Sequence, residues 1–134
     1  MIAGVRRRVT ASLLVSALLP WIIAMAQAQP DPERGRIEYL ISSIATLQGA
    51  QFLRNGTTHD AVAAADHLRL KWSKAGSRVK TAEDFIRYCA TQSSMSGQPY
   101  EIRFADGRVV KTAQYLQQKL AEYDAAQSRA GSAH

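Results

Sequence analysis

The sequence predicts a small α+β domain of three helices, a short antiparallel β-hairpin and a C-terminal helix that pack together. Three observations support this fold class. Apolar residues recur at helical spacing in four segments, apolar and charged residues alternate in one short segment near residue 100, and turn-forming residues separate these segments. Helices that precede and follow a single hairpin are typical of an α+β domain.

The first two helices are predicted from their apolar stripes and their ends. One helix is expected from Pro32 to Gln48, where apolar residues fall on one continuous face. These residues are Ile37, Leu40, Ile41, Ile44 and Leu47. A second helix is expected from His59 to Ala75, with Thr57 or Thr58 as its N-terminal cap. Several alanines on its apolar stripe favour close contact with another helix.

The third helix is expected to begin at Thr81, because Thr81 and Asp84 have the spacing of a capping box. Its apolar face carries Cys89, the only cysteine of the chain. This position predicts a buried core thiol, and an intermolecular disulfide is the alternative. A segment rich in Ser, Gly and Pro follows over Ser93–Pro99 and predicts a loop.

The hairpin and the last helix complete the domain. Tyr100–Phe104 alternates apolar and charged residues, Asp106-Gly107 has the composition of a tight turn, and Arg108–Lys111 forms the returning strand. Because an isolated two-stranded hairpin is unstable, its apolar face is expected to pack against helices. Thr112 is expected to cap the last helix. The small residues of 125–134 predict a disordered tail.

The first 28 residues have the organisation of a secretory signal peptide. Three arginines at residues 6–8 precede an apolar stretch over 9–25, and small residues alternate over 24–28. Cleavage is expected after Ala28 or two residues earlier, which would place the protein in the periplasm or outside the cell. An uncleaved membrane anchor is the alternative, although Pro20 interrupts an apolar stretch of only about 17 residues.

Length and charge narrow the possible functions. The chain of 134 residues has room for one domain, expected at 29–124, and its 46% hydrophobic and 21% charged residues are typical of a globular protein. The formal net charge is +6, but it falls to +3 when the three arginines of the predicted signal are removed. The basic composition is therefore weak evidence for a polyanion partner, and export argues against nucleic acid.

Several short motifs of the mature chain occur in the same order as in one known family. They are Phe52-Leu53-Arg54-Asn55-Gly56, His59, His67-Leu68-Arg69-Leu70-Lys71, Thr81-Ala82-Glu83-Asp84-Phe85-Ile86 and Ser93-Ser94-Met95-Ser96-Gly97-Gln98-Pro99-Tyr100. In these motifs the chain resembles the YfeK-like family of small exported bacterial proteins, a domain of unknown function with the number 5329. The resemblance covers Ile37 to Tyr123 and is loose in the hairpin and last helix. It implies export and a small helical domain, and it implies no activity.

Polar motifs outside the apolar stripes predict a contact surface. It is formed by a turn that could hold an anion, the polar face of the second helix and the loop before the hairpin. The candidate binding residues are Arg54, Asn55, Gly56, His67, Arg69, Lys71, Ser94, Ser96, Gly97 and Tyr100. The alternative is that the turn and loop are structural, with Arg54 paired to a nearby acid or carbonyl group.

No cofactor, metal site or catalytic group is expected. His59 and His67 are eight residues apart, about 12 Å along a helix, so they cannot chelate one metal ion alone. The serines near Ser96 lack the glycine pattern of a nucleophile elbow. A basic cluster over Lys71–Lys80 has the usual composition of a solvated helix end, and its candidate ligands in the envelope are anionic lipid, lipopolysaccharide or peptidoglycan.

These observations favour a non-enzymatic binding or interaction module of the cell envelope. Its partner is expected to be an envelope protein or an anionic envelope ligand, with membrane contact only during export. One alternative is an inhibitor of a lysozyme-like hydrolase, because Ser96-Gly97-Gln98-Pro99-Tyr100 fits a short pattern found in the loops of such inhibitors. The other alternative is a small envelope hydrolase that uses Ser96 or His67.

Overall fold

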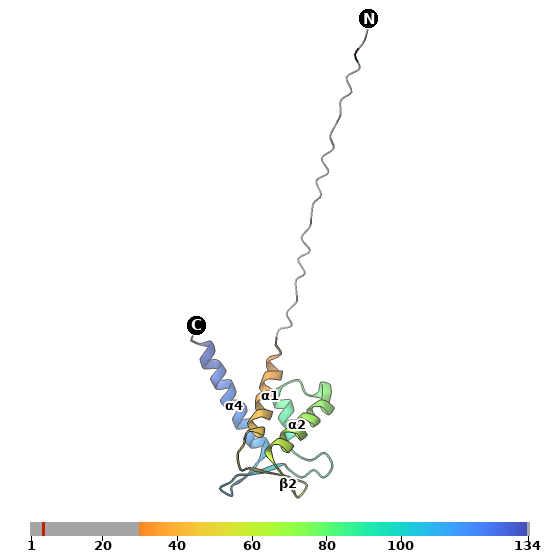
Figure 1. The fold of residues 1–134 in the computed structure, drawn as a ribbon, viewed down its shortest axis with the longest axis vertical. Coiled ribbons are helices and arrows are strands. Elements are labelled where there is room, and N and C mark those ends of the chain that lie inside the picture. Colours follow the sequence, from red (N-terminus) through yellow and green to blue (C-terminus); the bar gives the residue numbers. More distant parts are fainter. Residues whose placement is uncertain (1–3, 5–29, 134) are drawn as a thin grey trace.

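The computed structural model describes residues 30–133 together with Gly4, so the predicted signal peptide lies almost entirely outside the described residues. The helical elements are α1 (Pro32–Ala45), α2 (Ala61–Ala75), a short 3-10 helix η1 (Gly76–Arg78), α3 (Ala82–Phe85), its π-helical continuation η2 (Ile86–Ala90) and α4 (Thr112–Gly131). The strands are β1 (Gln51–Arg54), β2 (Thr57–His59), β3 (Glu101–Arg103) and β4 (Val109–Lys111). Figure 1 shows the sheet at one end of the domain, with the helices on one side of it.

The α+β class is confirmed, but the sheet is larger than the single predicted hairpin. Four antiparallel strands lie in the order β2-β1-β3-β4. The predicted hairpin is β3-β4, and the β1-β2 hairpin was missed. Asn55 and Gly56 connect β1 to β2 with φ values of 51° and 75°, as a tight hairpin turn requires. The turn was predicted, but strands of four and three residues are too short to show a period.

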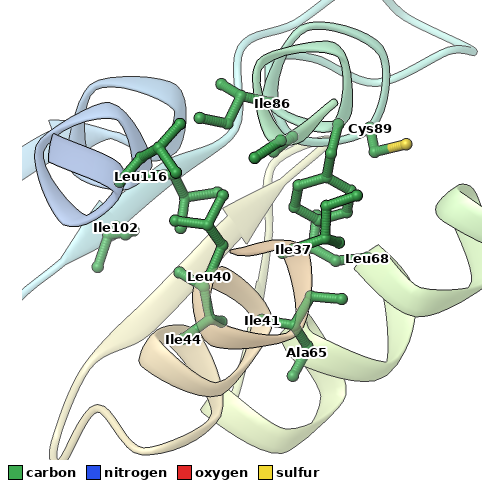
Figure 2. Close-up of a cluster of buried hydrophobic side chains, with 14 of the residues drawn as sticks. Ile37, Leu40, Ile41, Ile44, Ala65, Leu68, Ile86, Cys89, Ile102 and Leu116 are labelled. Atoms are coloured by element: carbon green, nitrogen blue, oxygen red, sulfur yellow. The ribbon is translucent and has the colours of Figure 1, made fainter. Parts of the chain in front are cut away.

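The core lies between the helices and the sheet, with α1 at its centre. The predicted stripe of α1 is buried at Ile37, Leu40, Ile41 and Ile44. Figure 2 shows these side chains facing residues from α2, η2 and α4. The prediction that Cys89 belongs to the core is confirmed, because its side chain is fully buried on η2 as a free thiol.

The predicted end of the first helix and the predicted cap of the second need correction. The first helix ends at Ala45 rather than Gln48. The cap of α2 is Asp60, whose carboxylate accepts a hydrogen bond from the backbone N–H of Ala63 at 2.7 Å. The predicted caps Thr57 and Thr58 are instead in β2. Asp60 was overlooked because Thr57 and Thr58, just before it in the sequence, are also residue types that cap helices.

The N-terminus of α4 also differs from the prediction. Thr112 is the first helical residue rather than the cap, and the capping position, Lys111, makes no side-chain hydrogen bond. The capping box of the third helix, by contrast, is confirmed, because Thr81 and Asp84 each accept a hydrogen bond from the other's backbone N–H.

The predicted disordered tail is helical in the structure as far as Gly131. Alanine is the strongest helix former, and this segment is rich in it. In addition, the hydroxyl groups of Ser128 and Ser132 each donate to a carbonyl four residues earlier. The last part of α4 is exposed and extends beyond the other helices in Figure 1.

The corrected cap leads to a stability prediction. Asp60→Ala is expected to lower the free energy of unfolding by about 1 kcal/mol, because it leaves an N–H group at the start of α2 without its acceptor. Thr58→Ala is the matched control and is expected to change it by less than about 0.5 kcal/mol. Urea unfolding of both variants measures the difference. A larger loss for Thr58→Ala than for Asp60→Ala would contradict the assignment of the cap.

Candidate functional site

The structure brings together the three segments that the sequence predicted as a contact surface. The hydroxyl group of Ser96, in the loop, donates a hydrogen bond to the side-chain oxygen of Asn55, in the β1-β2 turn. The ammonium group of Lys71, on α2, donates to the carbonyl oxygen of Gln92 at 2.8 Å, just before the loop. The turn, the loop and α2 are therefore directly connected, although up to 41 residues separate the bonded groups.

Tyr100 lies at the centre of this surface. Its backbone is held on both sides, because its N–H donates to Thr91 and its carbonyl accepts from Thr112. Its hydroxyl oxygen is 3.1 Å from Nε2 of His67 and 3.2 Å from Nζ of Lys71. His67 and Lys71 reach the same hydroxyl because they are one turn apart on the same face of α2.

The surroundings of His67 favour a neutral imidazole. Burial, and after it the positive charges of Arg54 and Lys71, together lower the pKa of His67 from 6.5 to about 4. An ammonium group can only donate, so the oxygen of Tyr100 accepts from Lys71, and its own proton is free to be donated to the unprotonated Nε2 of a neutral His67. His67 is therefore neutral near pH 7.

A small pocket lies beside these residues, between α2 and the sheet. Its lining residues are Phe52, Leu53, Arg54, His59, Ala64, His67, Leu68, Tyr100, Glu101 and Thr112. The cavity volume is about 30 Å³, enough for one or two water-sized groups. Its walls are mainly apolar, so a guest would have a small apolar body.

One buried polar atom of the lining has no partner. The hydroxyl oxygen of Thr112 makes no hydrogen bond within the part of the chain that the structure describes, and this residue is 3% exposed. An unpartnered buried hydroxyl destabilises a fold by about 1–3 kcal/mol. The sequence could not identify this group, because Thr112 begins a helix that follows the whole β3-β4 hairpin.

Positive charge dominates the surroundings of the pocket. The guanidinium group of Arg54 lines it, and the ammonium group of Lys71 lies next to it through Tyr100. Glu101 is the single carboxylate of the lining. Within residues 30–133, neither Arg54 nor Lys71 forms a salt bridge. The arrangement favours a ligand that carries a negative charge.

The neutral state of His67 leads to a pH prediction. The unfolded chain takes up a proton at this histidine near pH 6.5, whereas the folded protein does so only near pH 4. Between these pH values the unfolded chain binds more protons at this histidine than the folded protein does. The free energy of unfolding is therefore unaffected by His67 above pH 6.5 and decreases as the pH falls from 6.5 towards 4. Urea unfolding between these pH values should show a weaker pH dependence for His67→Gln than for the native protein. An equal dependence would contradict the assignment.

Some of the predicted binding residues lie elsewhere or have structural roles. Arg69 forms a salt bridge with Asp66 at 3.1 Å and lines a different groove of α2. Gly97 adopts a φ of 71° and turns the loop back on itself, and its N–H donates to the carbonyl of Ser93. Ser94 lines a neighbouring groove rather than the pocket.

Ser96 and His67, the two side chains considered for a hydrolase, are engaged in other contacts. The Ser96 hydroxyl donates to Asn55, and Nε2 of His67 bonds to Tyr100. Burial raises the pKa of the Cys89 thiol, which disfavours the reactive thiolate. Among the described residues, no group of three His, Cys, Asp or Glu side chains could hold a metal ion.

Among the described residues, no helix is both long enough and apolar enough to span a membrane.

Comparison with known proteins gave one family and one curated relative. A family model described as "Family of unknown function (DUF5329)" matches residues 31–124. The "Uncharacterized protein YfeK" of Salmonella typhimurium strain LT2 is 38% identical over 86 residues, which cover 64% of this chain and 71% of that protein. No solved structure matches the chain.

Proposed function

We propose that this chain, which belongs to the DUF5329 family of unknown function, is a non-enzymatic binding module of the cell envelope. Its contact surface is the pocket beside Tyr100 together with the Asn55 turn and the Ser96 loop. The observation that carries the proposal is that three polar segments, distant in sequence, meet around a pocket with an unpartnered buried hydroxyl. The envelope location depends on the signal peptide predicted at residues 1–28.

The pocket indicates the chemistry of the ligand. Its small volume admits a methyl-sized or hydroxyl-sized group, and Thr112 could donate a hydrogen bond to an oxygen atom of that group. The guanidinium group of Arg54 can donate two parallel hydrogen bonds to a carboxylate or phosphate group outside the pocket. A partner with a short side chain or chain end next to an anionic group fits both features.

Mass-spectrometric capture from a cell-envelope extract tests this proposal. The protein is expressed from its full sequence, purified and immobilised as the native form, Arg54→Ala, Thr112→Val and Arg103→Ala. Arg103 is the matched control because it is an exposed arginine of the same sheet that does not line the pocket. Thr112→Val keeps the shape of the side chain and removes the unpartnered hydroxyl, so the variant is expected to fold.

The expected result is a protein, lipid or glycan species held by the native and Arg103→Ala forms. At least tenfold less of it should be held by the folded Arg54→Ala and Thr112→Val forms. Circular dichroism establishes that each variant is folded. A species held equally by all four forms, or no specific species in repeated captures, would overturn the proposal.

The inhibitor hypothesis remains a second candidate, with one observation for it and one against it. Ser96 and Gly97 are exposed in the loop, where a partner could reach them. Tyr100 is only 7% exposed and contacts His67 and Lys71, so it cannot enter another protein's cleft without leaving the core. A lysozyme inhibition assay tests the inhibitor hypothesis. Hydrolysis assays on envelope substrates test whether the protein is a hydrolase.

A further inference from the structure

A second groove lies on the neighbouring face of the domain. It is lined by Lys71, Lys74, Ala75, Arg78, Tyr88 and Ser94, and its volume is about 140 Å³. The lining comes from α2, η1, η2 and the loop after them, so it is assembled by the tertiary structure. Among residues 30–133, no carboxylate belongs to the lining.

Arg87 lies next to this groove and also lines a separate groove, which contains Glu83 and Asp124. The guanidinium carbon of Arg87 lies 5.4 Å from the centroid of the Tyr88 ring, and that of Arg78 lies 5.2 Å from the same centroid. Within residues 30–133, none of these cations, nor Lys71 or Lys74, forms a salt bridge. Tyr88 thus holds two unneutralised arginines beside two unneutralised lysines.

The usual explanation of such a cluster is too narrow here. Cations near the C-terminus of a helix are stabilised by its partial negative charge, and this accounts for Lys74. It also accounts for Arg87, which lies in the last turn of η2. It does not account for Lys71, which lies before the last turn of α2.

An exposed apolar side chain stands next to the groove. Met95 is 93% exposed, and its neighbour Ser94 lines the groove. The hydroxyl oxygen of Ser93 accepts hydrogen bonds from the backbone N–H groups of Met95 and Ser96, so the loop presents Met95 in a defined turn. A large apolar side chain at such exposure has no role in the stability of the domain.

We propose that this groove docks the protein onto the surface of a bilayer that contains anionic phospholipid. The phosphate groups contact Lys71, Lys74 and Arg78, and Met95 enters the boundary between head groups and acyl chains. Basic residues beside an exposed apolar side chain are the combination that peripheral membrane binding uses. This goes beyond the proposed function. The two surfaces share Lys71, which donates to the Tyr100 hydroxyl, and the loop that carries Ser94 and Ser96, whereas Lys74 and Arg78 line the groove and not the pocket.

Co-sedimentation with vesicles tests the proposal. One set of vesicles is an equimolar mixture of phosphatidylcholine and phosphatidylglycerol, and the other is phosphatidylcholine alone. The native protein is expected to sediment with the anionic vesicles only, and less so as salt is added. Each basic side chain near the surface contributes roughly fivefold to the affinity. The double variant Lys74→Glu/Arg78→Glu should therefore lose at least about tenfold.

Three further variants make the test specific. The control Arg103→Glu/Lys111→Glu makes the same change in net charge at exposed positions of the sheet and should retain most of the binding. Met95→Ala should lose severalfold, and Arg54→Ala should bind vesicles as the native protein does. Because Arg54→Ala is expected to lose the pocket ligand, the two proposals can fail separately.

The proposal would be overturned by equal binding of the native protein and Lys74→Glu/Arg78→Glu. An equal loss in the sheet control would also overturn it, because net charge alone would then explain the binding. Full displacement by inorganic phosphate at matched ionic strength would show a site for free phosphate instead of a membrane-docking surface.

Discussion

Replacing Phe85 with alanine is expected to lower the free energy of unfolding by about 3–5 kcal/mol. Phe85 is fully buried at the end of α3, where its ring meets Trp72 of α2 edge to face at 6.1 Å between centroids. The substitution removes the whole ring and leaves a cavity that the surrounding helices can fill only partly. For a domain of this size the melting temperature should fall by roughly 12 °C or more.

Thermal and urea unfolding of two variants measure this effect. Val62→Ala is the control, because Val62 is 62% exposed on α2 and alanine is the better helix former. It should change the free energy of unfolding by less than about 0.5 kcal/mol. If Phe85→Ala cost less than about 1 kcal/mol, the packing of α3 against α2 would be wrong.

Replacing Arg36 with alanine is expected to cost about 2 kcal/mol. Its side chain is 17% exposed and forms salt bridges with Glu33 of α1, Glu83 of α3 and Asp124 of α4, at 2.7–2.9 Å. Glu33 also accepts the backbone N–H of Ala82 at 2.8 Å, at the start of α3. Without the guanidinium group, three carboxylates would repel one another where three helices meet. Hydrogen bonds to charged groups contribute about 1.5–3 kcal/mol each, and solvent reduces this at partly exposed sites.

Arg69→Ala is the matched control, because Arg69 is 46% exposed and pairs with Asp66 alone. It should cost only a few tenths of a kcal/mol, about the value of a single pair on a helix surface. Arg36→Lys should lie between the native protein and Arg36→Ala, since it keeps the charge and loses the forked geometry. Equal unfolding free energies for Arg36→Ala and Arg69→Ala would contradict the role of this network.

The pH dependence gives an independent check of the Arg36 network. The hydrogen bond from Arg36 lowers the pKa of Glu83 below its usual 4.5. Glu83 therefore stabilises the fold above that value, and the contribution is lost as the pH falls through its lowered pKa. The difference between the native protein and Arg36→Ala should shrink in the same direction as the carboxylates become protonated. A difference that stayed constant with pH would show that packing, and not charge, explains the effect.

Local sequence patterns predicted most of the candidate site but not its pocket. The polar residues of the Arg54 turn, of α2 and of the Ser96 loop were predicted as one surface from their places outside the apolar stripes. The contacts of Ser96 with Asn55 and of Tyr100 with α2 place these segments together in the fold. Thr112 was predicted only as a helix cap, because nothing in its own neighbourhood indicates a pocket.

By itself, the sequence determined the features that depend on near neighbours along the chain. Helical spacing located the four main helices, the positive φ that Asn55 and Gly56 tolerate located a turn, and the spacing of Thr81 and Asp84 located a helix start. These signals are readable because each arises within one or two turns of chain.

Only the tertiary structure decided which of these features meet. β1 is a strand because its backbone pairs with β3, about fifty residues later, and three or four residues carry no periodic signal of that pairing. The pocket and the basic groove likewise take their linings from α2 and from elements distant in sequence. Both sites depend on how α2 packs against the sheet and η2, and that packing follows from burial of the whole apolar core rather than from any one segment.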